Sequence, residues 1–585
     1  MSDDGNIGLY SALFKPIPQP CDPAVAQIAD DRSTGMRPRR ESAFVISVCS
    51  ARLPSRAETA ERIDRMATPP GIAPPRASAY AYYVLGILFL VYVLNFVDRQ
   101  IISILAEDIK RDLHLKDEDL GFLYGTAFGV FYSLFGIPLG RLADNWHRVR
   151  LMTAGLVLWS SMTALSGFAR SGGMLVGARI GVGIGEATAS PSAYSLISDY
   201  FPKKLRATAL AIYSSGLYVG GGVSLSIAGL VVHRWNAVYP AGGPLGLHGW
   251  QAAFIAVGLP GLLLALLVAT LREPVRGAVE GLPPPERHPA PFRALLADLL
   301  TIVPPFTLIG AARGGVRPLA INLLALGVVA GAIAVLRHFG EPWPQWTAVG
   351  LGAYAVFSWA SALKRRDLPT YTLVIANPAF LCVVIAYGLN AFVSYGVSLW
   401  AAPYAMRTLG VTIQQAGGWI GGTLAFGGFV GVTVGGIVAD RLRRRFPAGR
   451  IMVILFGAVV PLPFIVIAFR SGDVSIFVSA LLVAATCSST ALGAAGATMQ
   501  DLVLPRMRGT ATGAFFIGTT LLGLAMGPYI AGRVSTLSGS LTTGVLSLLL
   551  TAPITIGAAI AAYRLVPRAE ANREARARAA GEVIA

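Results

Sequence analysis

The chain has 585 residues, of which 54% are hydrophobic, only 14% are charged and 66 are glycine. An average soluble protein carries about 25% charged residues, and the mean hydropathy of +0.60 is also too high for a chain that must cover itself with polar surface. The composition excludes a soluble enzyme and predicts a protein that crosses a membrane many times.

The net charge of +17 comes from 48 Lys and Arg residues against 31 Asp and Glu residues. Such an excess indicates either nucleic-acid or anionic-ligand binding, or the positive-inside bias of membrane proteins. The four cysteines lack metal-ligand spacing and do not suggest a disulfide framework. We therefore expect no metal and no cofactor.

Residues 1–78 are rich in Arg, Pro and Ser. Their one short apolar piece, Phe44–Cys49, is far too short to cross a bilayer. Residues 1–20 show no basic region followed by an apolar core, so no signal peptide is expected. This composition predicts a disordered cytoplasmic tail.

From Ala79 onward, apolar runs recur at the length of about 20 residues that a transmembrane helix needs. A first set of six covers 80–104, 119–140, 151–169, 174–197, 207–231 and 250–271. A polar, proline-rich stretch follows, then two runs at 318–336 and 346–363. A second set of six covers 378–401, 416–438, 451–469, 474–498, 510–533 and 541–563.

This pattern predicts an all-α polytopic membrane protein with about 14 transmembrane helices. We expect two six-helix halves plus two inserted helices. The predicted domains are the tail 1–78, an N-terminal half 79–272, a linker with the inserted helices 273–375, a C-terminal half 376–566 and a C-terminal tail 567–585.

The basic residues gather on one side of these spans, while the first loop on the other side is acidic. The basic side holds Arg141, Arg148, Arg150, Lys203, Lys204, Arg206, Lys364, Arg365, Arg366, Arg441, Arg443, Arg444, Arg445, Arg450, Arg506 and Arg508. The acidic loop holds Glu107, Asp108, Asp112, Asp117, Glu118 and Asp119. By the positive-inside rule both termini are cytoplasmic, in the inner or plasma membrane, and nucleic-acid binding is excluded.

The two sets of six resemble each other in sequence. Gly140–Asp144 is echoed by Gly436–Asp440, at an offset of 296 residues between the aspartates. Asp199–Arg206 is echoed by Asp501–Arg508, at an offset of 302. Parallel six-helix repeats predict a transporter whose two halves rock about a site near the membrane midplane.

These motifs resemble the major facilitator superfamily. Its signature loop is matched by Gly140, Asp144, Arg148 and Arg150, with departures at Asn145 and His147. The second half keeps Asp440 and Arg441, and the fourth-helix motif is matched by Arg179, Gly183 and Gly185.

A narrower likeness is to the spinster branch of that family. It rests on Asn95-Phe96-Val97-Asp98-Arg99, on Gly183-Ile184-Gly185-Glu186-Ala187 and on the Asn377-Pro378 start of a later span. Animal members of this branch are associated with the export of lysophospholipids or sphingosine phosphate. The resemblance therefore implies a transporter of an amphipathic solute, although the two inserted helices are not part of the plain twelve-helix pattern.

Charged side chains inside the spans are candidates for the mechanism, because burying a charge in a bilayer is costly. With no histidine inside a span, proton coupling would fall to Asp98 or Glu186. The alternative is a permanent ion pair that only orients the helices. We predict that Arg99 and Arg179 bind an anionic head group, and that the helical face of 179, 183 and 186 lines the central cavity. Weaker candidates for substrate contact are Asn95, Tyr132, Asn390 and Tyr395.

A second set of charges flanks the spans on the predicted cytoplasmic side. A carboxylate at a span end can pair with an arginine of a neighbouring helix and latch one state of a transporter. The predicted gating residues are Asp144, Arg148, Asp440, Arg441, Asp199, Arg206, Asp501 and Arg508. The alternative is that these charges only anchor the helix ends at the lipid head groups.

The sequence therefore predicts a secondary active transporter of a small amphipathic or anionic organic solute, driven by protons and working by alternating access. No Walker loop and no catalytic constellation is found, so we expect neither ATP-driven transport nor enzyme activity. The expected partners are a small-molecule substrate, protons and the lipid bilayer, and the chain is expected to act as a monomer. The alternatives are an uncoupled facilitator and a non-transporting receptor or scaffold on the same fold.

Overall fold

The computed structural model describes residues 78–240, 242–276 and 289–583, and every regular element within those ranges is a helix. The predicted N-terminal tail lies outside the described residues except for Ser78. That residue is the N-cap of the first described helix, and its hydroxyl accepts a hydrogen bond from the Ala81 amide at 3.1 Å.

The N-terminal group of helices corresponds to the first six predicted spans. The π-helical turn η2 (Phe122–Thr126) joins α5 to α6, and a short break after Glu186 separates α8 from α9. The helices are α4 (Ala79–Leu113), α5 (Asp117–Gly121), α6 (Ala127–Asn145), α7 (Arg148–Ser166), α8 (Gly172–Glu186), α9 (Ala189–Tyr200), α10 (Lys203–Val238) and α11 (Gly249–Ala269).

Five helices connect this group to the next. They are α12 (Pro291–Ile302), α13 (Phe306–Arg313), α14 (Val316–His338), α15 (Trp343–Arg366) and α16 (Leu368–Val374). The helices α14 and α15 are the two predicted inserted spans. The proline-rich stretch before them was predicted only as a polar linker, but its end forms α12 and α13, which are bent by 98° to each other.

The C-terminal group corresponds to the last six predicted spans. A second π-helical turn, η6 (Thr520–Leu524), lies between α23 and α24. The helices are α17 (Pro378–Thr408), α18 (Ile413–Arg445), α19 (Gly449–Val459), α20 (Pro461–Arg470), α21 (Val474–Ser489), α22 (Ala491–Asp501), α23 (Arg508–Thr519), α24 (Gly527–Ser538), α25 (Leu541–Ser547), α26 (Ala552–Ala571) and α27 (Arg573–Ala579).

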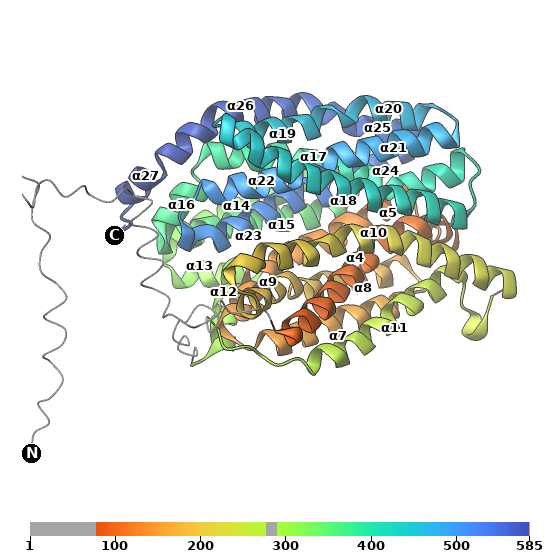
Figure 1. The fold of residues 1–585 in the computed structure, drawn as a ribbon, viewed down its shortest axis with the longest axis horizontal. Coiled ribbons are helices and arrows are strands. Elements are labelled where there is room, and N and C mark those ends of the chain that lie inside the picture. The colour runs from red at the N-terminus through yellow and green to blue at the C-terminus, as the bar shows by residue number, and fades with distance from the viewer. Residues whose placement is uncertain (1–77, 241, 277–288, 584–585) are drawn as a thin grey trace, which may run out of the picture. The chain divides into compact units, whose positions relative to one another are not determined.

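The predicted fold class is confirmed, because each of the fourteen predicted spans is helical. Among the described residues, twelve helical stretches are long and apolar enough to cross a membrane, or thirteen if the bent pair α12–α13 counts as one span. The remaining two predicted spans correspond to α7 and to the broken pair α8–α9. Figure 1 shows the N-terminal helices, in orange to yellow, beside the C-terminal helices, in cyan to blue.

The two groups, called the N-half (α4–α11) and the C-half (α17–α26), meet where α4 packs against α17 and along two further seams. The first seam joins α10 to α18, and glycines let the backbones approach closely: a Cβ on Gly222 would lie 2.4 Å from the Gly421 carbonyl oxygen. The second seam joins η2 and α6 to α23, η6 and α24, where a Cβ on Gly125 would lie 2.2 Å from the Leu524 carbonyl oxygen. Both π-helical turns therefore lie on the second seam.

The two ends of the helix bundle differ in charge. We call the end with residues 141–150 and 441–450 the basic end, and the end with residues 107–119 the acidic end. A hydrophobic core of large buried side chains, including Trp159, Trp250 and Trp400, runs between the two ends. The charged residues inside that core are few, so their positions define the candidate site.

Candidate functional site

Four charged side chains from two N-half helices are buried together. They are Asp98 and Arg99 on α4 and Arg179 and Glu186 on α8, and we call them the charged group. Arg99 Nε donates to Glu186 Oε2 at 2.7 Å, and the Glu186 side chain is fully buried whereas that of Arg99 is 14% exposed. The sequence motifs that predicted the site therefore meet as an ion pair in the structure.

Aromatic rings surround the guanidinium of Arg99. Its centre lies 4.5 Å from the ring centroid of Tyr132, 4.7 Å from that of Phe128 and 4.8 Å from that of Phe96. Such contacts stabilise a cation through the electron-rich ring faces, especially where water is excluded. They keep Arg99 charged and in place beside Glu186.

The second pair in the charged group is bonded less completely. Arg179 Nη1 donates to the backbone oxygen of Asp98 at 3.0 Å, not to its carboxylate. The Asp98 side chain is fully buried, and no arginine in the described part of the chain donates to its carboxylate. The polar groups that face this carboxylate are the Trp159 indole and the Thr163 hydroxyl of α7.

The face of α8 that carries Arg179, Gly183 and Glu186 was predicted to line the central cavity, and the structure corrects this. The face packs against α6 instead, since a Cβ on Gly183 would lie only 2.6 Å from the carbonyl oxygen of Phe128. Glycine at this position allows the two backbones to touch. As a result Arg179 and Glu186 are each only 1% exposed.

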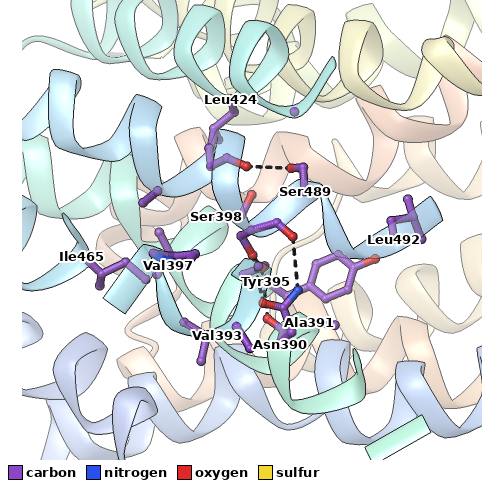
Figure 2. Close-up of a pocket in the computed structure, with 18 of the residues that line it drawn as sticks. Asn390, Ala391, Val393, Tyr395, Val397, Ser398, Leu424, Ile465, Ser489 and Leu492 are labelled. Carbon is purple, nitrogen blue, oxygen red and sulfur yellow. Dashed lines mark hydrogen bonds between the residues drawn. The ribbon is translucent and has the colours of Figure 1, made fainter. Parts of the chain in front are cut away.

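A cavity of about 210 Å³ lies next to the charged group, mainly within the C-half. Phe96 and Gln100 of α4 and Tyr218 of α10 contribute to its wall, and the rest comes mostly from α17, α18 and α20–α22. None of its described lining residues is charged; the polar ones are amides and hydroxyls. Figure 2 shows Asn390, Tyr395, Ser398 and Ser489 among the apolar side chains that surround it.

Hydrogen bonds order the polar wall of this cavity. Ser394 and Ser488 share a hydrogen bond of 2.6 Å, and Ser488 donates to Asn390 Oδ1 at 3.2 Å. On the acidic-end side, Gln100 Nε2 donates to Ser398 Oγ at 2.9 Å and thereby ties α4 to α17. The cavity is therefore a preformed apolar space with a few fixed polar groups, as small-molecule sites usually are.

The structure separates the predicted substrate contacts into two places. Asn390 and Tyr395 line the cavity. Arg179 belongs to the charged group and Asn95 lies beside Glu186 of that group; both are 1% exposed, and Tyr132 packs on Arg99. Phe96 connects the two places, because it lines the cavity and also contacts the Arg99 guanidinium. Arg99 therefore adjoins the cavity wall through its contact with Phe96.

At the basic end, the same ion pair occurs once in each half. Arg148 pairs with Asp199 in the N-half, and Arg450 pairs with Asp501 in the C-half. Both pairs are separated by 51 residues. Arg450 was not among the predicted gating residues, although the 302-residue offset between Asp199 and Asp501 also links Arg148 to Arg450.

Further contacts hold each of these pairs. Arg148 is fully buried, donates to Glu273 at 2.7 Å and to the Ser195 hydroxyl at 2.8 Å. Arg276 donates to backbone carbonyls around Asp144, and burial together with the charge of Arg148 lowers the pKa of Arg276. Glu273 and Arg276 follow the last N-half helix and were missed by the sequence analysis.

The remaining predicted gating residues also lie at the basic end. Asp440 pairs with Arg450 at 3.1 Å, and Arg206 donates to the Ser198 carbonyl oxygen at 2.7 Å. Arg441 lies near the end of α18, and Arg508 begins α23. A gating role for all of these residues stays a prediction.

Ion pairs between the two halves occur at the acidic end. Arg407 of α17 pairs with Glu107 at 2.6 Å and with Asp117 at 2.7 Å, and Arg533 of α24 pairs with Glu118 at 2.6 Å. Among the described residues, the salt bridges that join the N-half directly to the C-half all lie here. The sequence analysis noted the acidic loop but did not match it with these two arginines of the second half.

No group of three or more His, Cys, Asp or Glu residues that could hold a metal ion is found in the ranges that the structure describes. The two cysteines within those ranges, Cys382 and Cys487, are unpaired. The chemistry of the site is therefore that of ion pairs, hydrogen bonds and an apolar cavity.

Comparison with known proteins gives consistent similarities. The sequence profile of the Major Facilitator Superfamily matches residues 88–528 and 383–584. An MFS-type efflux pump of Mycolicibacterium smegmatis is 27% identical over 455 residues, which cover 78% of this chain and 84% of the pump. Protein spinster homolog 1 of Xenopus tropicalis is 25% identical over 466 residues, or 77% of this chain and 72% of that protein.

A solved structure shares the fold. The crystal structure of a bacterial homolog to the human lysosomal transporter spinster, in an inward-facing and unoccupied conformation, matches with a TM-score of 0.60 and 25% sequence identity. The match covers 86% of this chain and 99% of that protein.

Proposed function

Because the chain belongs to the Major Facilitator Superfamily and is spinster-like within it, we propose that it is a proton-coupled secondary active transporter. Its substrate is a small amphipathic or anionic organic solute, with a lysolipid as the most specific version. Transport proceeds by alternating access between the two faces of the membrane.

The observation that carries this proposal is the contact between the charged group and the uncharged cavity. Phe96 lies against both, so a solute whose apolar part occupies the cavity can bring an anionic end to Arg99. The amides and hydroxyls of Asn390, Ser394 and Ser488 offer hydrogen bonds without a charge. An apolar chain with a polar, anionic end fits both surroundings at once.

A substrate anion and Glu186 would compete for the same arginine. Glu186 is fully buried and its ion pair with Arg99 compensates its charge. If a substrate anion takes Arg99, an ionised Glu186 would lose its hydrogen-bonded ion pair in the membrane interior, which is costly, so uptake of a proton accompanies substrate binding. Asp98, fully buried and with no arginine of the described residues bonded to its carboxylate, is the second candidate for the proton.

Both ends of the bundle have a place in the cycle. The cross-half ion pairs of Arg407 and Arg533 close the acidic end, and their release opens it. The repeated pairs Arg148–Asp199 and Arg450–Asp501 hold each half rigid at the basic end. By the positive-inside rule the basic end is cytoplasmic, with both termini on that side of the plasma membrane and a monomer as the working unit.

Flux measurements in proteoliposomes test this proposal. The wild type, Asp98→Asn and Glu186→Gln would be compared in uptake of a panel of lysolipids and small organic acids, with and without an imposed pH gradient. We expect gradient-driven flux in the wild type and its loss in one of the two variants, together with substrate-dependent proton movement. Asp473→Asn is a matched control, because it removes a carboxylate from the N-cap of α21 and asparagine is an equally good cap.

The other outcomes select the alternatives. Flux that does not depend on the gradient and survives in both variants indicates an uncoupled facilitator, with the charged group acting as a structural ion pair. Absence of flux for every solute in a well-folded wild type would favour a receptor or scaffold.

A further inference from the structure

The inserted helix α15 lies along the second seam between the two halves. Its buried side chains Ala355, Trp359 and Leu363 share one hydrophobic cluster with α6 and with the C-half. The other members include Val130 and Leu134 of α6, Ile517 of α23 and Leu521 of η6. A Cβ on Gly352 would lie 2.8 Å from the Leu521 side chain and 3.6 Å from that of Val130, so α15 contacts both halves at one point.

A buried polar contact also joins α15, the N-half and the C-half. Gln345 of α15 is 1% exposed, and its Oε1 accepts a hydrogen bond of 2.6 Å from the Thr126 hydroxyl of the N-half. The same hydroxyl lies 2.6 Å from the carbonyl oxygen of Ala525 in the C-half. Buried polar groups need hydrogen-bond partners, and these are found only when the packing is specific. The contacts of Gln345 therefore show that α15 is a specific part of the seam.

The turn before α15 also contacts one of the ion pairs that join the two halves at the acidic end. Glu341 pairs with Arg533 at 3.2 Å, and Arg533 in turn pairs with Glu118 of the N-half. Glu341 also accepts hydrogen bonds from Trp346 at 3.1 Å and from Tyr529 at 3.3 Å. The contact of α15 with the seam thus extends from the acidic end to Leu363, close to the basic end.

The first seam, between α10 and α18, borders the cavity, whereas the described residues of the second seam do not. Tyr218 and Gly222 of α10 and Leu424 and Gly428 of α18 all line the cavity. Its described lining includes no residue of α6, α15, α23 or α24. The cavity therefore adjoins the seam that the inserted helices leave uncovered.

We propose that α15 seals the second seam against the bilayer, so that a membrane-dissolved substrate that enters between the two halves does so between α10 and α18. The seal follows from the packing alone, whereas the route rests on the proposed transport function. The partner of α15 is α14, whose apolar residues such as Leu324 and Val328 are 71% and 65% exposed and face lipid. The inserted pair thus presents one helix to the bilayer and buries the other in the seam.

The seal is tested with a lipid that reacts where it touches the protein. The full-length chain would be reconstituted in phosphatidylethanolamine and phosphatidylglycerol vesicles that contain a phosphatidylcholine with a diazirine on one acyl chain. After illumination, adducts are mapped by mass spectrometry. We expect adducts on α14 and on the outer faces of α10 and α18, and none on Val130, Leu134, Ile517 or Leu521. Adducts on those four residues in the wild type overturn the seal.

A matched pair of variants tests whether α15 is what covers the seam. Gly352→Phe places a large ring against Leu521 and should push α15 outward, whereas Gly331→Phe puts the same ring on α14, where a Cβ meets nothing within 4 Å. Adducts on Val130 and Leu134 should appear in Gly352→Phe and stay absent in Gly331→Phe. Equal labelling of both variants contradicts the proposal. If Gly352→Phe does not fold, the wild-type adduct map alone decides.

The route is tested with a diazirine-tailed lysophosphatidylethanolamine and an excess of its unlabelled form. Adducts that the competitor removes should lie on α10, α18 and the cavity residues of α17. Competitor-sensitive adducts on α6 or η6 overturn the one-sided route while leaving the transport function intact. If no adduct responds to the competitor, the lysolipid substrate and its route both fail, and the seal is still judged by the diacyl lipid.

Discussion

The two halves of the bundle share an ion pair at the basic end but differ in their interiors. At the basic end, Arg148–Asp199 and Arg450–Asp501 form the same ion pair at the same separation of 51 residues. In the interior, the N-half buries the charged group of four residues, whereas the cavity wall of the C-half contains amides and hydroxyls but no charge.

This difference separates the mechanical parts of the repeat from its chemical parts. The pairs at the basic end join neighbouring helices within one half, so both halves need them for rigid-body movement. The interior has no such constraint, and charge placed in one half leaves the other free to accept an apolar chain. The repeat would therefore divide proton handling and solute binding between its halves, which the following predictions test.

The largest effect is expected at Arg99. Arg99→Met leaves the fully buried Glu186 without its ion-pair partner, which should lower the free energy of unfolding by about 3–5 kcal/mol and abolish gradient-driven flux. Denaturant unfolding in detergent and the flux assay measure the two effects.

A double variant separates structure from function at this pair. Arg99→Met/Glu186→Met removes both charges and should recover most of the lost stability, because neither charge is left buried alone. Flux should stay absent if the charged group handles the proton and the anionic end. Recovery of flux along with stability would make the pair purely structural and would remove the proposed division between the halves.

The next prediction compares the two repeated ion pairs. Arg148 is fully buried and bonds Glu273 and Ser195 in addition to Asp199, whereas Arg450 is 19% exposed. Arg148→Gln should therefore lower the free energy of unfolding by about 3 kcal/mol, and Arg450→Gln by about 1 kcal/mol. Equal losses in denaturant unfolding would show that the linker residue Glu273 contributes nothing and that the two ion pairs are equivalent.

A charge placed in the wall of the C-half cavity tests whether solute binding needs that wall to be uncharged. Asn390→Asp keeps the shape of the side chain and should weaken binding of an amphipathic or anionic solute by about 2 kcal/mol, or roughly 30-fold in KM. Asn390→Ala removes only hydrogen bonds and should cost about 1 kcal/mol. If neither variant changes KM, the substrate lies elsewhere and the C-half is not the solute-binding half.

Most of the fold could be predicted from the sequence, because bilayer thickness fixes the length of an apolar run and charge fixes its ends. The motifs at Asp98–Arg99 and at Glu186 led to the charged group for the same reason, since a charge in a span is rare. What could not be predicted is which partner each charge finds. The sequence repeat places Asp199 seven residues before Arg206 and Asp501 seven residues before Arg508, yet the ion pairs in the structure join the two aspartates to Arg148 and Arg450, 51 residues away.

Two other features depend on packing that one helix cannot reveal. The face of Arg179 and Glu186 was predicted to line the cavity, but Gly183 draws it against Phe128 of α6, and a glycine alone does not say which helix approaches it. The ion pairs that join the two halves at the acidic end link residues 290 to 415 positions apart, such as Glu107 and Arg407. The sequence contains the acidic loop and the two arginines, Arg407 and Arg533. Which of these residues pair becomes evident only once the two halves are placed face to face.

The smallest effect is expected at Asp367, which lies outside the spans. Hydrogen bonds from Arg506 and Thr370 outweigh partial burial and lower the pKa of Asp367 to about 2, and Arg506 likewise lowers the pKa of Glu582. A carboxyl with a depressed pKa stabilises the fold above its ordinary pKa and loses that contribution only as the pH falls toward about 2.

This cluster should therefore be silent over the pH range of transport. Asp367→Asn should lower the Tm by the same small amount at about pH 5.5 and about pH 7.5, and it should leave the pH dependence of flux unchanged. A pH profile that moves in this variant would place a titrating group of the cycle outside the N-half, in the segment between α15 and α16 at the basic end. The proposed confinement of proton chemistry to the charged group of the N-half would then be wrong.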